Sequence, residues 1–312
     1  MKEIKVNFVD FWSGFDKTNN YFYNLLIQKY KVCIDEKPEL LFYSCYSNNY
    51  LNYNCTRIFY AGENVRPDFF ACDFAFSFDY NHRKNHFRLP LYSLYIDHHN
   101  MLGQLQTIRT RDEAREIWRS KTKFCCMVVS NPNSSKRLEF YNTLSQLRQV
   151  DSGGSVLNNV GGRVANKTEF IKDYKFVISF ENSEQDGYTT EKIMEPILVD
   201  CIPIYWGNKL IDKDFNAKRF LDYNKFESEK KLIDKLLEID QNDELAIDML
   251  LQPTFSENKL SHKEEHLKVL NILSLIIDNP DKSISRQFWR SLHKFKLLCY
   301  KFKRDLKKFK LV

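Results

Sequence analysis

The sequence predicts an α/β protein with two doubly wound parallel sheets in tandem. Short strand-like runs alternate with helical patterns over the first third, and a second strand–helix alternation starts after residue 120. The 312 residues are 43% hydrophobic, which supplies enough core for two domains and excludes a disordered chain. We therefore expect domains at residues 1–120 and 121–282, followed by a basic tail at 283–312.

The first domain is predicted to contain five short strands and a helix. Residues 2–10 alternate apolar and polar side chains, as a half-buried strand does, and residues 19–30 place Phe22, Leu25 and Leu26 on one helical face. The remaining strands are predicted at residues 30–35, 39–46, 57–63 and 72–79.

The second domain follows a β-α-β-α-β order, which is typical of a parallel sheet. It is preceded by residues 111–121, predicted to be an exposed helix that bridges the domains because it has little apolar face. We predict strands at residues 123–131, 175–182 and 201–207, and helices at 134–147, around 166–174 and at 189–199. Pro196 would lie about two turns into the last of these helices and kink it.

The cysteine pattern and the N-terminus indicate a cytoplasmic protein. The eight cysteines form no C-x-x-C pair and several lie in apolar runs, as reduced core thiols do. We find neither a signal peptide nor an apolar run of membrane-spanning length.

The stretch FENSEQDGYTTEKI, residues 180–193, is the first candidate for a binding site. It follows an apolar strand, so it should open at the edge where open α/β sheets bind ligands. A helix capped by Thr189 or Thr190 would then point its unpaired N–H groups at an anion, and Lys192 would add a full positive charge.

Two further side chains of this stretch suit a sugar nucleotide. Tyr188 offers a hydroxyl donor, and Glu191, which would repel phosphate, suits a hydroxyl-rich sugar. The alternative is an ordinary capped helix whose Glu191 and Lys192 face solvent.

A second strand-to-helix junction, SNPNSSKRLEFY, places Arg137 near the first turn of its helix. Arg137 and Lys192 would then converge on one diphosphate, for which the planar guanidinium is well suited. The alternative for Arg137 is a surface charge.

On these motifs the sequence resembles the α-1,3-fucosyltransferases of glycosyltransferase family 10, above all the bacterial members. The likeness covers roughly residues 55 to 220, and the pieces occur in the family's order. They are IFYAGENVRPDFFACDFAFSFD, FRLPLY, GGSVLNNVGGRVANKTEFIKDYKFVISFENS, FENSEQDGYTTEKI, CIPIYWG and DFN.

The resemblance implies a GT-B fold, in which two Rossmann-like domains face each other across a cleft. It implies transfer of L-fucose from GDP-β-L-fucose to the 3-hydroxyl of N-acetylglucosamine or glucose, with inversion, giving a Lewis-type product. The family's general base corresponds to Glu63 in the turn that follows residues 57–62. The alternative is a structural Glu63 that pairs with Arg66 or Arg57.

The resemblance also implies a set of donor-binding residues. Arg137 and Lys192 correspond to the family's phosphate-binding positions, Asn182 and Tyr188 to further donor contacts, and Glu191 to a carboxylate near ribose or fucose. Lys167 and Gly154 correspond to the loop beside the nucleotide.

No metal cofactor is implied, because protein cations would stabilise the leaving diphosphate. Manganese or magnesium ions would at most stimulate activity without a dedicated site. Two alternatives are weak. Asp212 and Asp214 form a D-x-D pair in a loop after a strand, and His98–His99 lacks the spacing of a zinc motif.

The residues that would bind the acceptor sugar are harder to identify from the sequence. Phe11 and Trp12 follow the first strand and could stack on a sugar face, and Tyr92 is a similar candidate. For all three the alternative is packing in the core or at its rim, and the same ambiguity applies to Tyr95.

The tail at 283–312 holds ten Lys or Arg residues and one Asp, with apolar residues recurring at three and four. Such an amphipathic basic helix is typical of proteins bound to anionic membranes, so we expect peripheral attachment at the inner face of the cytoplasmic membrane, near lipid-linked glycan acceptors. The alternatives are docking on the protein itself and nucleic-acid binding. We expect no nucleic-acid partner, because the rest of the chain is slightly acidic.

Three other functions remain open at this stage. They are an α-1,4- or α-1,3/4-fucosyltransferase, a GT-B transferase with another nucleotide sugar, and a non-catalytic module that binds a sugar or nucleotide. The acceptor, an oligosaccharide or a lipid-linked glycan, is not identified by the sequence.

Overall fold

The computed structural model describes residues 1–257, 259, 261–279 and 295, which fall into two compact units. The first unit holds Met1–Leu89 together with helix α10 (His262–Asp278), and the second holds the chain from Pro90 onward up to residue 259. This division differs from the boundary predicted near residue 120. Residues 90–120 join the second unit because Trp118 is buried in that unit's core.

The sheet of the first unit has six parallel strands in the order β2-β1-β3-β4-β5-β6. All five strands predicted here are confirmed, and the short edge strand β6 was not predicted. The strands are β1 (Glu3–Val9), β2 (Lys31–Ile34), β3 (Leu40–Tyr43), β4 (Thr56–Tyr60), β5 (Phe74–Ser77) and β6 (His86–Arg88).

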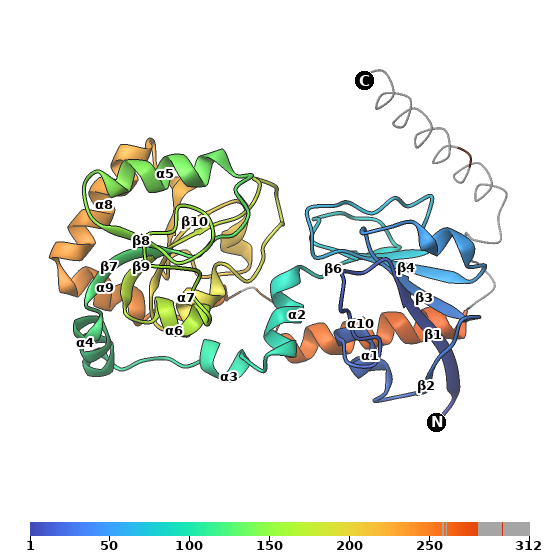
Figure 1. The fold of residues 1–312 in the computed structure, drawn as a ribbon. Coiled ribbons are helices and arrows are strands. Elements are labelled where there is room, and N and C mark those ends of the chain that lie inside the picture. The colour runs from blue at the N-terminus through green and yellow to red at the C-terminus, as the bar shows by residue number, and fades with distance from the viewer. Residues whose placement is uncertain (258, 260, 280–294, 296–312) are drawn as a thin grey trace, which may run out of the picture. The chain divides into compact units, whose positions relative to one another are not determined.

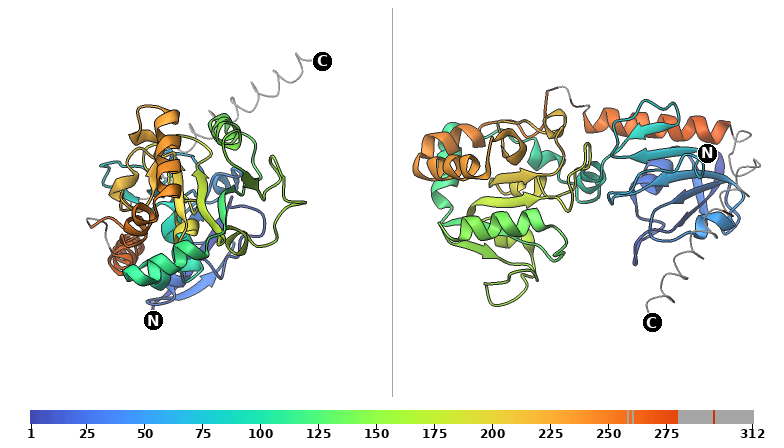
Figure 2. Two further views of the ribbon diagram at one scale, coloured as in Figure 1. Left: turned by 90° about the vertical axis from the view of Figure 1, so that its left-hand side faces the viewer. Right: turned by 90° about the horizontal axis from the view of Figure 1, so that it is seen from above.

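The helices of the first unit are α1 (Tyr21–Leu26), the 3-10 turn η1 (Asn49–Asn52) and α10. Asn20 precedes helix α1 as its N-cap, and its side chain accepts a hydrogen bond from the Tyr23 N–H. Although α10 is far away in sequence, it lies beside α1 (Figures 1 and 2), and Lys29 Nζ donates to Ser274 Oγ over 3.0 Å.

The sheet of the second unit has five parallel strands in the order β11-β10-β9-β7-β8. The chain goes first from β7 to the edge strand β8, then crosses to β9 on the other side of β7. The winding direction therefore reverses between β7 and β9, and ligands of such sheets bind at the carboxyl ends of the two strands. The strands are β7 (Lys123–Met127), β8 (Val150–Ser152), β9 (Tyr174–Phe180), β10 (Ile202–Trp206) and β11 (Leu221–Asp222).

Helices cover both faces of this sheet, as the alternation along β9 requires. Phe176, Ile178 and Phe180 pack in one core with α4, α5, α8 and α9, whereas Val177 packs on the opposite face, next to α6 (Figure 1). The helices are α2 (Leu91–His98), α3 (Leu102–Leu105), α4 (Arg111–Ser120), α5 (Ser135–Ser145), α6 (Lys167–Ile171), α7 (Met194–Leu198), α8 (Glu229–Gln241) and α9 (Asp243–Leu250), with the 3-10 turns η2 (Ile211–Lys213) and η3 (Tyr223–Lys225).

Helix α4 was predicted to be an exposed bridge between domains, and that prediction is wrong. Its two apolar core residues, Ala114 and Trp118, are buried against the second sheet and α9. The Trp118 indole N–H donates to Asp243 Oδ1 over 2.8 Å, which satisfies its one polar group.

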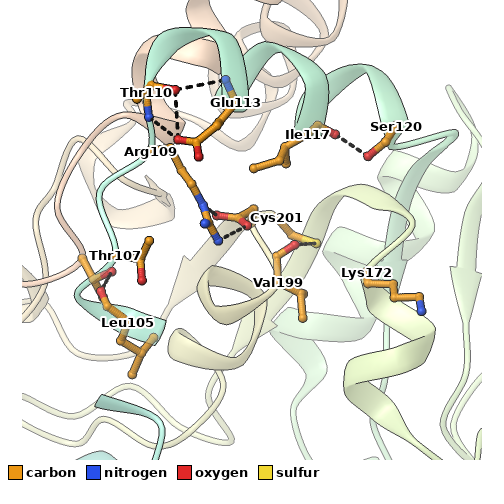
Figure 3. A network of polar contacts seen from close by, with 12 residues as sticks. Leu105, Thr107, Arg109, Thr110, Glu113, Ile117, Ser120, Lys172, Val199 and Cys201 are labelled. Atoms are coloured by element: carbon orange, nitrogen blue, oxygen red, sulfur yellow. Dashed lines mark hydrogen bonds and ion pairs between the residues drawn. The ribbon is translucent and has the colours of Figure 1, made fainter. Parts of the chain in front are cut away.

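Two cations lie at the amino-terminal edge of the second sheet. Lys121 is buried, whereas Arg109, which Figure 3 shows with its contacts, is partly exposed. The ammonium of Lys121 donates to the carbonyls of Lys172 (2.7 Å) and Val199 (2.9 Å), which end helices α6 and α7. A cation is favourable at these carboxyl ends because the last carbonyls of a helix lack partners and carry partial negative charge. Beside it, Arg109 forms a two-pronged ion pair with Asp200.

The seven described cysteines are free thiols, and five of them are buried. Within the described residues, no helix combines the length and apolar character that crossing a membrane requires. The predicted helix at 283–312 lies outside the described part of the chain, Phe295 apart.

Candidate functional site

In the second unit, the polar residues predicted to bind a ligand gather at the carboxyl ends of β7 and β9. Arg137 is the third residue of α5, which follows β7, and its side chain is buried. Its guanidinium donates to the Phe180 carbonyl (2.8 Å) and to Asn182 Oδ1 (2.9 Å), both at the end of β9. The alternative of a surface charge is therefore wrong for Arg137.

The guanidinium of Arg137 is a buried cation. Burial lowers the pKa of its guanidinium, while Glu181 and Tyr188 oppose that shift. Its Nε is buried and has no hydrogen-bond partner among the described residues. A buried guanidinium with an unused donor is an arrangement suited to an anion.

Glu181 is the residue at this edge that the sequence analysis missed. Its carboxylate is fully buried and accepts hydrogen bonds from the Thr190 N–H (2.8 Å), the Thr190 hydroxyl (2.8 Å) and Lys192 Nζ (3.1 Å). The sequence did contain a signal for Glu181, because this acidic residue directly follows an apolar strand. A carboxylate at a buried strand end needs hydrogen-bond or ion-pair partners.

Lys192 lies beside this carboxylate and is also mostly buried. Its ammonium donates to Glu181 and, over 2.9 Å, to the Thr190 hydroxyl, and it lies 3.5 Å from Glu191. Burial lowers the pKa of Lys192, but Glu181 and Glu191 outweigh burial and raise it overall. Lys192 is therefore a fixed cation and not a solvent-facing side chain.

The predicted helix start at Thr189 or Thr190 is wrong. Helix α7 begins at Met194, and residues 191–193 form turns. The reason is that Glu181 takes the Thr190 N–H that would have opened a helix, so this N–H is not offered to a ligand. Pro196 consequently lies in the first turn of α7, where its missing N–H costs no helical hydrogen bond, and the predicted kink does not arise.

Residues Gly207 and Asn208, just after β10, support the segment that carries Lys192. Gly207 has φ +150°, and a Cβ at this position would lie 2.6 Å from Glu181 Cγ, so only glycine leaves room for the buried carboxylate. Asn208 accepts from the Gly187 N–H (2.7 Å) and donates to the Thr189 hydroxyl (3.0 Å).

Further charged residues of the second unit lie near the segment that carries Lys192. Lys167, the first residue of α6, forms an ion pair with Glu195 of α7, and Tyr95 donates to the same carboxylate over 3.0 Å. Burial raises the pKa of Glu191, but Lys192 and Lys167 lower it more strongly, so that it is lowered overall. Glu191 is thus a carboxylate held between two lysines.

Gly154 and Tyr188 are also placed by packing. A Cβ on Gly154 would come within 1.9 Å of the Val129 carbonyl oxygen, so close backbone approach requires glycine there. Tyr188 is buried next to Arg137. Their roles in ligand binding stay predictions.

In the first unit, Glu63 lies just past the carboxyl end of β4, as predicted. It is exposed, and its Oε1 accepts a hydrogen bond from the Tyr46 hydroxyl over 3.0 Å. Neither predicted structural partner contacts it. Arg66 pairs with Asp79 (2.9 Å), and Arg57 donates to the Tyr53 carbonyl (2.9 Å).

Phe11 and Trp12 form an aromatic group with Phe15 at the carboxyl end of β1. The rings of Phe11 and Phe15 stack at 4.1 Å, and the Trp12 ring meets Phe15 edge-on at 5.0 Å. Trp12 is 44% exposed, so one of its faces is accessible to a sugar.

The prediction that Tyr92 contacts an acceptor is wrong. Its side chain is only 1% exposed and packs against Phe215 in a core of the second unit, at a ring distance of 5.0 Å. Tyr92 is the second residue of α2, and the apolar side of that helix buries it.

The D-x-D pair does not form an open carboxylate cluster. Asp214 is buried, whereas Asp212 is exposed and its carboxylate lies 3.4 Å from the Lys225 ammonium. The carboxylate oxygens of such a pair would have to face one ion together.

Two family models match the chain. The "Alpha-(1,3)-fucosyltransferase FucT N-terminal domain" matches residues 6–95, and the "Glycosyltransferase family 10 (fucosyltransferase) C-term" matches residues 118–250. Together they span more than half of the chain.

Similar proteins agree with these matches. The chain is 32% identical over 272 residues to the alpha-(1,3)-fucosyltransferase FucT of Helicobacter pylori, covering 75% of this chain but only 56% of that protein. A crystal structure of an alpha1,3-fucosyltransferase with GDP is similar at a TM-score of 0.75 and 29% identity, covering 91% of this chain and 92% of the other. Another with GDP-fucose has a TM-score of 0.72 at 28% identity, covering 86% and 90%.

The geometry around Gly207 yields a test of the buried Glu181. We expect Gly207→Ala to lower the free energy of unfolding by about 2–4 kcal/mol, because the new Cβ meets Glu181 and the backbone is strained. Gly103→Ala is the matched control, since no atom lies within 4 Å of its added Cβ, and it should change stability by less than about 1 kcal/mol. Urea unfolding followed by circular dichroism measures both, and equal effects would contradict the described packing.

Proposed function

Because this chain belongs to glycosyltransferase family 10, we propose that it is an inverting α-1,3-fucosyltransferase. The donor would be GDP-β-L-fucose, and the acceptor would be the 3-hydroxyl of an N-acetylglucosamine or glucose residue in a glycan such as N-acetyllactosamine. The observation that carries the proposal is the pair of buried cations, Arg137 and Lys192, at the switch point of the second sheet.

The diphosphate of the donor would bind where these two cations meet. Arg137 and Lys192 are already fixed by Asn182 and Glu181, so little side-chain freedom is lost on binding. The ammonium of Lys192 donates one N–H to Glu181 and one to Thr190, which leaves its third N–H for a phosphate oxygen. The diphosphate leaving group gains charge in the transition state, and preorganised cations stabilise such charge.

Glu191 and Tyr188 would contact the ribose or fucose. Glu191 stays ionised between Lys167 and Lys192, and a carboxylate accepts hydrogen bonds from sugar hydroxyls. Protein cations thus take the part that a metal plays in other transferases, and we propose no dedicated metal site, although divalent ions would still be free to stimulate turnover.

Glu63 would act as the general base. Its carboxylate takes the proton of the acceptor hydroxyl while that oxygen forms a bond to the anomeric carbon of fucose. The bond from this carbon to the β-phosphate oxygen breaks, and its electron pair leaves with GDP. Attack opposite the leaving group inverts the anomeric centre. Phe11 and Trp12 are the proposed stacking surface for the acceptor sugar.

The chain spans a little over half the length of the Helicobacter pylori relative. Acceptor choice and membrane attachment are therefore proposals for this chain. We propose that the basic segment 283–312 attaches it to an anionic inner leaflet, where a lipid-linked glycan would be the acceptor.

The general-base assignment predicts a specific loss. Glu63→Gln should lower turnover of GDP-fucose with N-acetyllactosamine by about 10²-fold or more, because the amide cannot accept the proton. Affinity for GDP, measured by calorimetry, should stay unchanged. Glu36→Gln is the matched control, because Glu36 also accepts from a tyrosine in the first unit. Turnover by Glu63→Gln within tenfold of the wild type would refute the assignment.

The donor-site assignment predicts a loss of affinity. Lys192→Met should weaken GDP binding by about 10- to 100-fold, as expected when one charge-assisted hydrogen bond is removed. Lys230→Met, on the exposed face of α8, should leave GDP affinity unchanged. Equal GDP affinity of both variants in calorimetry would place the nucleotide elsewhere.

The membrane proposal predicts a dependence on charge. The full chain should sediment with vesicles rich in phosphatidylserine, and both high salt and deletion of residues 283–312 should release it, since each Lys or Arg near an anionic surface contributes about 1 kcal/mol. Vesicles of phosphatidylcholine alone serve as the control. Sedimentation that survives the deletion would contradict this role of the tail.

A further inference from the structure

We propose that Tyr46 is a positioning residue for the reaction, fixing the carboxylate of Glu63 in the orientation from which it accepts the proton of the incoming hydroxyl. This inference rests on the proposed function, because it assumes that Glu63 is the base. No motif in the sequence singled out Tyr46.

The topology of the first sheet brings the two side chains together. Strands β3 and β4 are parallel neighbours, with Tyr43 opposite Phe59. Tyr46 and Glu63 each lie three residues beyond the end of their strand, at the carboxyl edge of the sheet. There the Tyr46 hydroxyl donates to Glu63 Oε1 over 3.0 Å.

Tyr46 is itself held by the segment that follows β1. Its N–H donates to the Asp10 carbonyl over 3.0 Å, and the Asp10 carboxylate accepts from the N–H groups of Asn49 (2.9 Å) and Tyr50 (2.8 Å). The same carboxylate accepts the Ser47 hydroxyl. Asp10 is buried in the left-handed region, at φ 62°. Four hydrogen bonds to Asp10 therefore set the path of residues 46–50.

This support matters because, among the described residues, the Tyr46 hydroxyl is the group that anchors the carboxylate of Glu63. The nearby Arg66 is engaged by Asp79, and the adjacent Cys45 is a neutral thiol whose pKa is raised by burial and, to a lesser extent, by Glu63. With Oε1 occupied by the phenol, Oε2 is the atom left to take the acceptor's proton.

The Tyr46 phenol stays a hydrogen-bond donor across the neutral pH range. Burial raises the pKa of Tyr46, and the contact with Glu63 raises it further. The hydroxyl therefore holds Glu63 Oε1 in one orientation throughout this range.

The first unit contains a matched control for this pair. Tyr53 donates its hydroxyl to Glu36 Oε2 over 3.2 Å, which is the same chemistry at a carboxylate with no proposed role. Tyr46 is 50% exposed, so replacing it by phenylalanine removes one oxygen atom without opening a cavity in the core.

The experiment compares Tyr46→Phe with Tyr53→Phe in pH–rate profiles, with GDP-fucose as donor and N-acetyllactosamine as acceptor. We expect Tyr46→Phe to lower kcat by about 3- to 10-fold across the neutral pH range and to leave the KM for GDP-fucose within about twofold of the wild-type value. Tyr53→Phe should change none of these quantities.

A Tyr46→Phe profile that coincides with that of Tyr53→Phe would overturn the inference. Glu63→Gln, measured alongside, separates this failure from failure of the proposed function. An inactive Glu63→Gln variant together with an unchanged kcat of Tyr46→Phe refutes the role of Tyr46 alone. An active Glu63→Gln variant refutes the base assignment on which that role depends.

Discussion

The buried ion pair between Glu181 and Lys192 sets the form of the carboxyl edge of the second sheet. A fully buried carboxylate is costly unless charge and hydrogen bonds compensate it, and here Lys192 and Thr190 supply both. The same contacts delay the start of α7 until Met194 and hold Lys192 at the end of β9. Gly207 is needed because any larger residue would occupy the space of the carboxylate. The buried carboxylate of Glu181 therefore orients the ammonium of Lys192, which a bound anion such as a phosphate would contact.

The two sheets share one winding pattern, although the residues at their carboxyl edges differ chemically. In each parallel sheet the second strand along the chain lies at an edge, and the third lies on the other side of the first, so the loops after the first and third strands diverge. In the first unit these loops carry Asp10 and Tyr46, and in the second the segment after β7 leads into α5 with Arg137, while the segment after β9 carries Glu181. The sheets place chemically unlike groups by the same topological rule, and hydrogen bonds between the loops then fix their orientation.

Much of this arrangement was predictable, because apolar periodicity identifies strands and the alternation of strands and helices indicates parallel sheets. The sequence also pointed to Arg137 and Lys192, since charged residues after strand ends reach the carboxyl edge of the sheet, and the family resemblance added Asn182. Helix boundaries were harder to predict. The start of α7 depends on a hydrogen bond from Thr190 to Glu181, nine residues earlier, which local propensity does not report.

Burial of single aromatic residues was equally inaccessible from the sequence. Tyr92 and Trp12 were both predicted to contact the acceptor, yet tertiary packing encloses the first and leaves the second partly open. The buried Lys121 has a further consequence. It binds the terminal carbonyls of α6 and α7 at the amino-terminal edge of the second sheet. The anchorage of these two helices therefore does not depend on the loops at the carboxyl edge, so substitutions in those loops would leave the scaffold intact.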